Sequence, residues 1–327
     1  MSRARRIPAS RAPPILPQPM RPIFFFPLPI FPPPFRLMAF SFTISLLLST
    51  GKNIVDNGWE LCYGVKKRRK IMIEKREVRG IEIAAWRNRR VWEEKKPALV
   101  FIPGSGGDHT LWLYVLNLLK DDFDLLAVEL PGHGSSGGRG EMEVGQYVEW
   151  MREILRAYGV DKPVLVGHSL GAAIVLSFAI SHSEELRGVV AIGGGARMPV
   201  NPMIFETIHK DLTGLMALTA KIAVAKKNRE RLASILAARS PNPDVLFGDF
   251  KACDGLDIDE DLKKINIPAL IVCGMEDKMT PPELSRELAE RIPGAKLALI
   301  PETGHMVMLE EPKRLAEIVS NFVSELT

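Results

Sequence analysis

The sequence has little cysteine and no long, uninterrupted apolar run. Its three cysteines, Cys62, Cys253 and Cys273, have the spacing of neither a disulfide framework nor a metal site. A reducing cytoplasm is therefore the expected location. The longest helix-compatible apolar stretch, residues 37–50, is shorter than the roughly 20 residues that cross a bilayer. We accordingly expect no stable membrane span.

Most of the chain lacks an excess of positive charge, although the net charge of all 327 residues is +4. Residues 1–71 hold 12 Lys and Arg against 2 Asp and Glu, which leaves 31 against 37 for residues 72–327. The larger part is thus mildly acidic, which argues against nucleic-acid binding. Only one glutamine, Gln146, follows Met72, while charged residues are plentiful. This usage hints at a thermophilic source.

Residues 1–71 differ in composition from the rest and form a basic, proline-rich leader. Eleven prolines lie between positions 8 and 34, beside FFF and PPP runs that suit neither helix nor strand. A signal peptide is one interpretation, which would make the protein secreted or membrane-associated, but the prolines interrupt its apolar core. Another is that the codons of Arg68 and Arg69 form a ribosome-binding site, with two further codons before Met72, and that Met72 starts the natural protein. We expect this leader to be either disordered or not natively translated.

From Met72 onward, apolar segments typical of strands alternate with amphipathic segments typical of helices. A first strand is expected over residues 78–86 and a weak second strand over 89–93. Such alternation predicts a mainly parallel sheet with helices on both faces. The later expected strands lie in ALVFIPG, FDLLAVELPG, PVLVG, LRGVVAIGGG, PALIVCG and AKLALIP.

One connection is too long for a loop. About seventy residues separate Gly195 from Ile267, whereas connections in α/β proteins usually have roughly 2 to 6. Apolar residues at helical spacing over 201–240 predict two or three helices there. We therefore expect an inserted helical cap over residues 199–265 that roofs the active site, and a core formed by 72–198 and 266–327.

A serine lies between two glycines in VGHSLGAA, where a predicted strand meets a predicted helix. Gly167, Ser169 and Gly171 match the pattern G-x-S-x-G. At such a turn the backbone is strained and exposes the hydroxyl, while the glycines let strand and helix approach each other. The pentapeptide alone is a weak signal, so a small residue in a turn is the alternative. The choice depends on whether a base and an acid accompany the serine.

His305 and Asp277 are the candidate partners of that serine. Each follows a predicted strand, in PETGHMVMLEEP and GMEDKMTPP respectively. Because parallel strands end at one edge of a sheet, both side chains should lie near Ser169. The three residues also have the chain order expected for a nucleophile elbow, with the acid between the serine and the histidine. The neighbouring Glu276 is the alternative acid, or else a solvated residue.

The sequence from about residue 77 to 322 resembles the α/β-hydrolase superfamily, especially its capped esterases, lactonases and monoacylglycerol-lipase-like members. This resemblance implies the α/β-hydrolase fold and a catalytic triad of Ser169, Asp277 and His305. It says much less about the substrate. The stretches that carry it are FIPGSGGDHTLW, ELPGHGSSG, VGHSLGAA, IVCGMEDKMTPP and ETGHMVMLEEP.

The resemblance and the mechanics of acyl transfer imply an oxyanion hole made by the backbone N–H groups of Ser105 and Leu170. The glycine-rich loop 104–107 would shape it. No lysine-serine continuation follows this loop, so it is not a phosphate cradle. The chain departs from the family twice: Pro103 replaces a histidine that often braces the loop, and Glu129 replaces an aspartate.

Methionines flank the candidate catalytic residues and could line a pocket for varied acyl chains. His133 is interpreted as structural, and Trp112 as packing under the oxyanion loop. The side chain of His168 should point away from the neighbouring serine. The expected pocket residues are Gly104, His168, Met203, Phe205, Met216, Met279 and Met306.

The function that these features favour is a serine hydrolase of the carboxylesterase and lipase class. It would cleave carboxylic esters of small or medium apolar acyl groups through an acyl-enzyme, with a small-molecule ester as its partner and no metal or cofactor. Lactonase, C–C hydrolase, aminopeptidase and cofactor-free haloperoxidase stay open within the fold. A non-catalytic ligand-binding protein is the alternative from another class. Neither the natural substrate nor the oligomeric state follows from the sequence.

Overall fold

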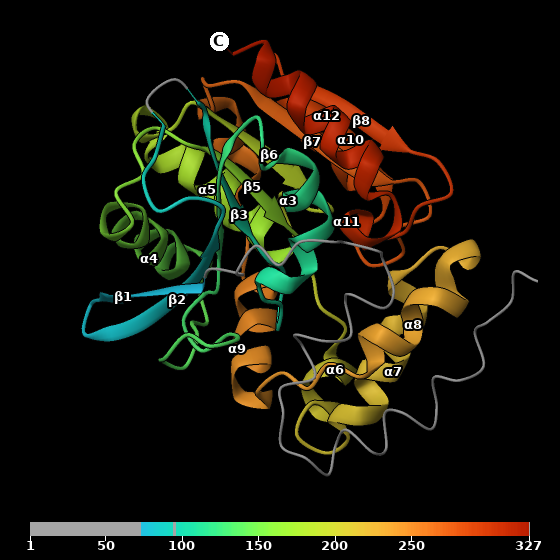
Figure 1. Ribbon diagram of the computed structural model, residues 1–327. Coiled ribbons are helices and arrows are strands. Elements are labelled where there is room, and N and C mark those ends of the chain that lie inside the picture. Colours follow the sequence, from blue (N-terminus) through green and yellow to red (C-terminus); the bar gives the residue numbers. More distant parts are fainter. Residues whose placement is uncertain (1–72, 94–95, 327) are drawn as a thin grey trace, which may run out of the picture. The chain divides into compact units, whose positions relative to one another are not determined.

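Eight strands form one sheet in the residues that the computed structural model describes, 73–93 and 96–326 (Figure 1). Their order is β1-β2-β4-β3-β5-β6-β7-β8. The pairs β1–β2 and β2–β4 are antiparallel, and all the other pairs are parallel. The predicted, mainly parallel sheet is confirmed. The expectations for residues 1–71 and for Met72 lie outside the described residues. The strands are β1 (Ile73–Val78), β2 (Ile81–Arg87), β3 (Ala98–Ile102), β4 (Asp124–Val128), β5 (Val164–His168), β6 (Gly188–Ile192), β7 (Ala269–Gly274) and β8 (Lys296–Ile300).

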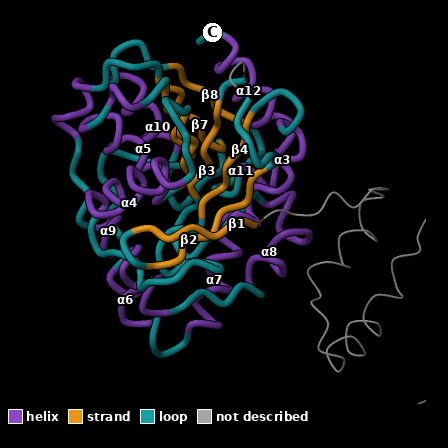
Figure 2. The backbone as a smooth tube through the Cα atoms, turned by 60° about the vertical axis from the view of Figure 1, so that its left-hand side comes forward, coloured by secondary structure: helices purple, strands orange, loops and turns teal. Residues whose placement is uncertain are grey.

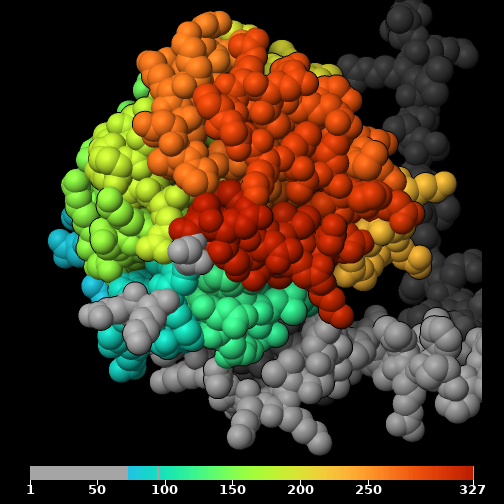
Figure 3. Space-filling view, turned by 90° about the horizontal axis from the view of Figure 1, so that it is seen from above, coloured from blue at the N-terminus to red at the C-terminus, as the bar shows by residue number. Residues whose placement is uncertain are grey.

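Helices cover both faces of this sheet. Figure 2 shows α4, α5 and α10 on one side of the strands and α3 and α12 on the other. The strands β4 to β7 are buried at every position, as expected where both faces are covered. α3 and α12, far apart in the sequence, lie side by side (Figure 3). These elements are α3 (Leu113–Leu119), α4 (Val144–Ala157), α5 (Leu170–Ser181), α10 (Pro282–Arg291), α11 (Val307–Glu310) and α12 (Pro312–Ser324), with 3-10 helices η2 (His109–Trp112) and η3 (Ser183–Glu185).

The start of the described fold differs from the sequence expectation. Where one strand was expected over residues 78–86, β1 and β2 form a hairpin joined by Arg79 and Gly80, with φ angles of 51° and 82°. Two consecutive residues with positive φ are typical of a tight hairpin turn. The polar, half-exposed β1 has too few apolar residues to signal a strand. The weak strand expected over 89–93 is absent from the structure, where Arg89 instead pairs with Asp124 at 2.7 Å.

Four α-helices lie between β6 and β7, in the segment where a cap was expected. Three of them, α6, α7 and α8, form a group apart from the sheet, whereas α9 lies against the core (Figure 1). Ala252 and Cys253 of α9 belong to the same buried cluster as α5. The boundaries 199–265 stay a prediction. The segment contains α6 (Pro202–Thr207), α7 (Leu212–Ala223), η4 (Lys226–Asn228), α8 (Arg229–Ala237), α9 (Pro243–Asp254) and η5 (Asp259–Lys264).

The carboxyl ends of the parallel strands meet beneath this inserted segment. Ser169 follows β5, Asp277 follows β7 and His305 follows β8. Ligands of open α/β sheets bind at this edge. No helix of the described chain is long and apolar enough to cross a membrane.

Candidate active site

Ser169 occupies a strained turn between β5 and α5. Its φ of 55° and ψ of −115° lie outside the regions that L-residues favour. Glycine is required on both sides: a Cβ on Gly167 would lie 2.0 Å from the Gly171 carbonyl oxygen, and one on Gly171 would lie 2.4 Å from the Ile102 carbonyl oxygen. The strand and helix therefore approach as closely as the elbow pattern predicted, and the serine projects from their junction.

Backbone hydrogen bonds fix this turn. The Ser169 carbonyl accepts from the N–H groups of Ala172 and Ala173 at 2.8 and 3.1 Å, so the helix begins immediately after the serine. The Ser169 N–H donates to the carbonyl of Ile192 on β6 at 2.9 Å. The serine is half-buried and reaches the pocket described below.

His305 and Asp277 form a buried pair at the same edge. His305 Nδ1 lies 2.8 Å from Asp277 Oδ2. The other oxygen, Oδ1, accepts from the N–H groups of Met279 and Thr280 at 2.8 and 2.9 Å, while the Thr280 hydroxyl donates to Oδ2 at 2.9 Å. Because Asp277 orients Nδ1, the other ring nitrogen is left for chemistry at the pocket.

The pKa of Asp277 is held below its ordinary value. Burial acts most strongly and would raise this pKa, but the charge of His305 and the hydrogen bonds from His305 and Thr280 outweigh it. The carboxylate therefore stays ionised near neutral pH. The part played by Thr280 was not predicted, although a threonine three residues after an aspartate is a recognisable turn signal.

The backbone of His305 is anchored from both sides. Its N–H donates to the carbonyl of Ala223, at the end of α7, at 2.8 Å, and its carbonyl accepts from His168 Nε2 at 2.9 Å. The preceding residue, Gly304, donates its N–H to the buried Glu310 carboxylate at 2.9 Å. The candidate base is therefore tied to the inserted segment, the serine turn and α11.

His168 lines the pocket, and its ring contacts the candidate base. The ring centroids of His168 and His305 are 4.5 Å apart. Burial, with the nearby charge of His305, lowers the pKa of His168 to about 3, so this ring is neutral and donates from Nε2. No sequence signal indicates its contact with the His305 carbonyl, because the two residues are joined only by the fold.

The glycine-rich loop packs directly on the serine turn. A Cβ on Gly104 would lie 3.0 Å from His168 Nδ1 and from Ser169 Cβ. Ser105 lines the same pocket as Ser169. Leu170 begins α5, and the first N–H groups of a helix have no acceptor within it. These positions agree with an oxyanion hole at Ser105 and Leu170, which stays a prediction.

Asp249 of α9 braces this loop, which begins after Pro103. The fully buried Asp249 accepts from the Gly106 N–H at 2.8 Å. It also lies 2.8 Å from His133 Nε2 and accepts from the Tyr147 hydroxyl at 2.6 Å. The brace therefore comes from a helix more than a hundred residues away along the chain.

His133 is part of this brace, in keeping with a structural role. Its Nδ1 lies 3.0 Å from the Pro131 carbonyl and its Nε2 faces the Asp249 carboxylate, so both nitrogens meet acceptors. Burial is the largest influence and would lower the pKa of His133, but the charge and hydrogen bond of Asp249, the Pro131 carbonyl and the charge of Asp108 raise it overall.

Replacing His133 by Gln should lower stability most at acidic pH. Because the folded pKa is raised, the protonated ring contributes stability below its unfolded pKa of about 6.5, and this contribution is lost as pH rises through the folded value. We expect a loss of about 1 to 3 kcal/mol near pH 6, shrinking toward pH 9. Urea unfolding across this range measures it, with His209→Gln, at an exposed pair with Asp244, as the control. A loss that grows with pH would contradict the assignment.

Glu129, which follows β4, links the 3-10 helix η2 to the loop around Ser135. One carboxylate oxygen lies 2.5 Å from His109 Nδ1 and the other accepts from the Ser135 N–H at 2.5 Å. The ligand atoms of Asp108, His109 and Glu129 lie within 4.8 Å of one another, as do those of a half-exposed group at residues 182–185. In the first group a metal ion would have to displace the Ser135 N–H and the Arg239 partner of Asp108.

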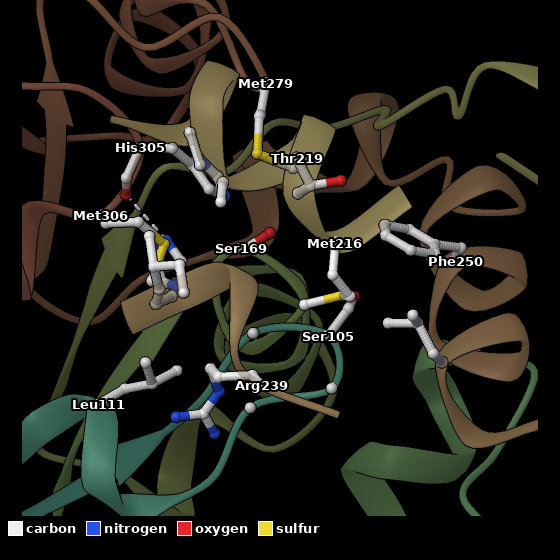
Figure 4. Close-up of a pocket in the computed structure, with 18 of the residues that line it drawn as sticks. Ser105, Leu111, Ser169, Met216, Thr219, Arg239, Phe250, Met279, His305 and Met306 are labelled. Atoms are coloured by element: carbon white, nitrogen blue, oxygen red, sulfur yellow. Dashed lines mark hydrogen bonds between the residues drawn. The ribbon is translucent and has the colours of Figure 1, made fainter. Parts of the chain in front are cut away.

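The pocket above Ser169 is largely apolar. Ser169 and His305 face one cavity, with Met216 and Phe250 across it from His305 (Figure 4). Met279 and Met306 also line it, as expected from the sequence. The residues that the inserted segment contributes are Leu215, Met216, Thr219, Ala220, Ala223, Leu236, Arg239, Leu246 and Phe250.

Two expected pocket residues lie elsewhere. Met203 is 68% exposed on α6, and the ring of Phe205 packs against Phe247 with centroids 5.4 Å apart. Neither lines the cavity, so that part of the prediction was wrong. Helical spacing identifies an apolar face but not the surface it meets, and α6 meets α7 and α9 instead of the cavity. Phe250 of α9 takes the place that was expected for Phe205.

Two other expectations concern residues beside the site. Glu276, the alternative acid, is exposed, and its side chain lies 3.4 Å from the Lys226 N–H. Trp112 is fully buried, with its ring 5.2 Å from Phe101 and edge-on to His168 at 6.5 Å. Asp277 is thus the acid that pairs with His305, and Trp112 packs behind the serine turn.

The comparisons with known proteins agree with this geometry. A family model described as the alpha/beta hydrolase family matches residues 99–318. The chain is 28% identical over 244 residues to a putative carbamate hydrolase, RutD, of Caulobacter sp. strain K31, covering 70% of this chain and 91% of the relative. It is 24% identical to the pimeloyl-[acyl-carrier protein] methyl ester esterase of Vibrio atlanticus, covering 68% of this chain and 93% of that one.

Solved structures share the fold. A thermophilic esterase superposes with a TM-score of 0.67 at 28% identity, covering 79% of this chain and 99% of its own. The enol-lactonase of Burkholderia xenovorans LB400 superposes with a TM-score of 0.71 at 20% identity. The match covers 77% of this chain and 100% of the lactonase chain. At 20% identity the second likeness concerns the fold alone.

Proposed function

The chain belongs to the alpha/beta hydrolase family, and from this premise we propose that it is a serine hydrolase that cleaves carboxylic esters through an acyl-enzyme. The observation that carries the proposal is the strained Ser169 turn beside the buried His305–Asp277 pair, with Ser169 and His305 lining one apolar pocket. A nucleophile, a base and an orienting acid are what acyl transfer requires.

In the first half-reaction, the Ser169 hydroxyl attacks the ester carbonyl while His305 Nε2 takes its proton. Asp277 keeps Nδ1 protonated and stabilises the imidazolium that forms. The N–H groups of Ser105 and Leu170 donate to the oxyanion of the tetrahedral intermediate. The carbon–oxygen bond to the alcohol then breaks, and His305 returns the proton to the leaving alcohol.

In the second half-reaction, water replaces the alcohol. His305 takes a proton from the water as it attacks the acyl-enzyme carbonyl, and the same two N–H groups receive the developing charge. Collapse of the second intermediate breaks the bond to Ser169, which regains its proton from His305. The free acid leaves, and no group outside the chain, substrate and water takes part.

The proposed reaction is tested with p-nitrophenyl esters of increasing acyl length and with a fluorophosphonate probe. We expect turnover of the esters and stoichiometric labelling, with a burst of p-nitrophenol wherever deacylation is the slower step. A protein that neither cleaves any ester nor reacts with the probe would be a non-catalytic member of the fold.

Apolar acyl groups of small or medium size are proposed because the pocket walls are apolar and large side chains stand across the cavity from His305. Met216 and Phe250 stand across the cavity from His305 (Figure 4). Such side chains exclude longer chains and contribute about 0.8 kcal/mol for each methylene they bury. The inserted segment therefore sets the preferred acyl length.

Shortening Met216 or Phe250 to Ala should move the preference toward longer acyl chains. We expect the ratio of kcat/KM between a medium and a short p-nitrophenyl ester to change by about 5- to 10-fold, because an apolar contact of one or two methylenes is gained or lost. Met203→Ala is the matched control, since the same type of side chain is exposed on α6. If the ratio in all three variants equalled that of the wild type, the core loops would define the pocket.

We also propose a cytoplasmic location. The thiols of Cys253 and Cys273 are free and buried. Burial raises the pKa of both to about 12, so neither is a reactive thiolate. Unpaired, inert thiols suit a reducing compartment.

A further inference from the structure

The apolar pocket contains one permanently charged side chain. Arg239 follows α8 in the inserted segment and lies between Leu111 and Ser105 in Figure 4. Apart from it and the histidines 168 and 305, the described side chains that line this pocket are uncharged. In a ligand pocket, a few placed polar groups fix the orientation of what binds. Arg239 is therefore the candidate for recognising a polar part of the substrate.

Arg239 is held rigidly. Its Nη2 donates to Asp108 Oδ2 at 2.5 Å and its Nη1 to the Thr110 hydroxyl at 3.1 Å. The segment after it packs closely on the glycine-rich loop, since a Cβ on Gly106 would lie 3.0 Å from Pro241 Cβ. The guanidinium is thus oriented before any ligand arrives, which lowers the entropy cost of binding.

The guanidinium has N–H donors to spare. Two contacts use two of them, and an arginine carries several more. Its side chain is 23% exposed and borders the cavity. A group that enters the cavity can therefore accept from Arg239 without breaking its bonds to Asp108 and Thr110.

The charge of Arg239 is already balanced. Burial is the largest influence on the pKa of Asp108 and would raise it, but the Arg239 charge and the hydrogen bonds from Thr110 lower it overall. Asp108 is therefore ionised, and the pair is neutral. A neutral pair gives little attraction to a second anion, so a neutral acceptor suits the remaining donors better.

A polar hollow begins where the apolar pocket meets Arg239. The two share Gly106 and Arg239 as lining residues. The hollow is also lined by Asp108, His133, Ser240 and Asn242. A substrate chain that extends from Ser169 past Arg239 therefore passes from apolar walls to polar walls.

We propose that the acyl group of the substrate ends in a neutral oxygen acceptor, a hydroxyl or a carbonyl, to which Arg239 donates. The assignment rests on the proposed esterase function and narrows its substrates to acids with an apolar segment beside the ester and an oxygen at the far end. Arg239 would be the residue that selects them.

The test compares three series of p-nitrophenyl esters over several chain lengths: alkanoates, ω-hydroxyalkanoates and half-esters of dicarboxylic acids. The wild type should favour the ω-hydroxy esters over alkanoates of equal length. Arg239→Gln should reduce that preference in kcat/KM about 10- to 100-fold and change alkanoate turnover only a few-fold, because a hydrogen bond from a charged donor is lost. Arg239→Lys, which keeps a cation for Asp108, covers the case in which the glutamine variant folds poorly; it should lose part of the preference.

Asp108→Asn provides the converse variant. It keeps an oxygen for the Thr110 N–H, which Asp108 Oδ1 accepts at 2.8 Å, but leaves the guanidinium unbalanced. Turnover of the half-esters should then rise about tenfold relative to the ω-hydroxy esters.

Three results would overturn the assignment. An equal fall for all three series in both Arg239 variants would make Arg239 only a tether between the inserted segment and the oxyanion loop. A wild-type preference for the half-esters would mean that the site takes an anion. If the wild type cleaves no ester of any series, the proposed function fails and the assignment fails with it.

Discussion

Ser169→Ala should abolish ester hydrolysis while leaving the fold intact. We expect kcat to fall on the order of 10⁶-fold, because the only proposed covalent acceptor is removed. His305→Ala should cost a comparable factor, since members of a triad act as a unit. Steady-state assays with p-nitrophenyl esters measure both losses.

The control for this loss is Ser177→Ala, on the same helix as the serine turn but outside the pocket lining. It should keep wild-type turnover. Ser169→Ala and Ser177→Ala should unfold within about 1 kcal/mol of the wild type if the loss is chemical and not structural. His305→Ala leaves the buried Asp277 carboxylate without its partner, so it should lose about 3 kcal/mol. If Ser169→Ala or His305→Ala kept more than roughly a hundredth of wild-type turnover, the triad assignment would be wrong.

Gly167→Ala should damage stability and activity together. The new Cβ would lie 2.0 Å from the oxygen and 2.3 Å from the carbon of the Gly171 carbonyl. Both are backbone atoms, so no side-chain rotation relieves the overlap and α5 must move away from β5. We expect a loss of about 3 kcal/mol in unfolding free energy. Turnover should fall on the order of 100-fold, because Ser169 sits at the junction that moves.

Gly145→Ala is the matched control for this substitution. Gly145 lies in the first turn of α4, where an added Cβ would meet no atom within 4 Å. Alanine favours a helix over glycine, so stability should be unchanged or raised by up to about 1 kcal/mol. Urea unfolding and ester turnover of the two variants make the comparison. If Gly167→Ala matched the wild type in both, the strand and helix would not approach as closely as the geometry requires.

Much of the fold was predictable because its signals are local. Most strands of the sheet are short apolar runs, and each candidate catalytic residue follows the end of a strand. Ser169 directly follows β5, whereas Asp277 lies three residues after β7 and His305 five residues after β8. Ser169, Asp277 and His305 could therefore be placed at one sheet edge without knowing any contact. The hairpin at the start was missed for the converse reason, since β1 is polar and half-exposed and resembles a loop.

Contacts across the fold could not be predicted. Asp249 binds the Gly106 N–H, and His168 binds the His305 carbonyl, over sequence separations of 143 and 137 residues. A buried aspartate on a helix carries no sign of the backbone group it will meet. In this chain such contacts brace the glycine-rich loop and the backbone of His305.

Only part of the pocket was predicted, because the packing of the inserted helices also depends on contacts across the fold. Met216, Met279 and Met306 line it as expected, whereas Met203 and Phe205 do not. An amphipathic helix shows which of its faces is apolar, but the partner of that face depends on how the helices pack. Arg239 was not singled out because a lone arginine after a helix is ordinarily a solvated residue.

The most direct test of the central claim is the mass of the protein caught during turnover. The wild type is mixed with a p-nitrophenyl ester, quenched in acid within the burst phase, digested and mapped by mass spectrometry. A peptide containing Ser169 should gain the mass of the acyl group, and no such gain should occur in Ser169→Ala. Hydrolysis that proceeds with the acyl group on another residue, or with no acyl-protein even when a slowly deacylating ester is used, would contradict the claim.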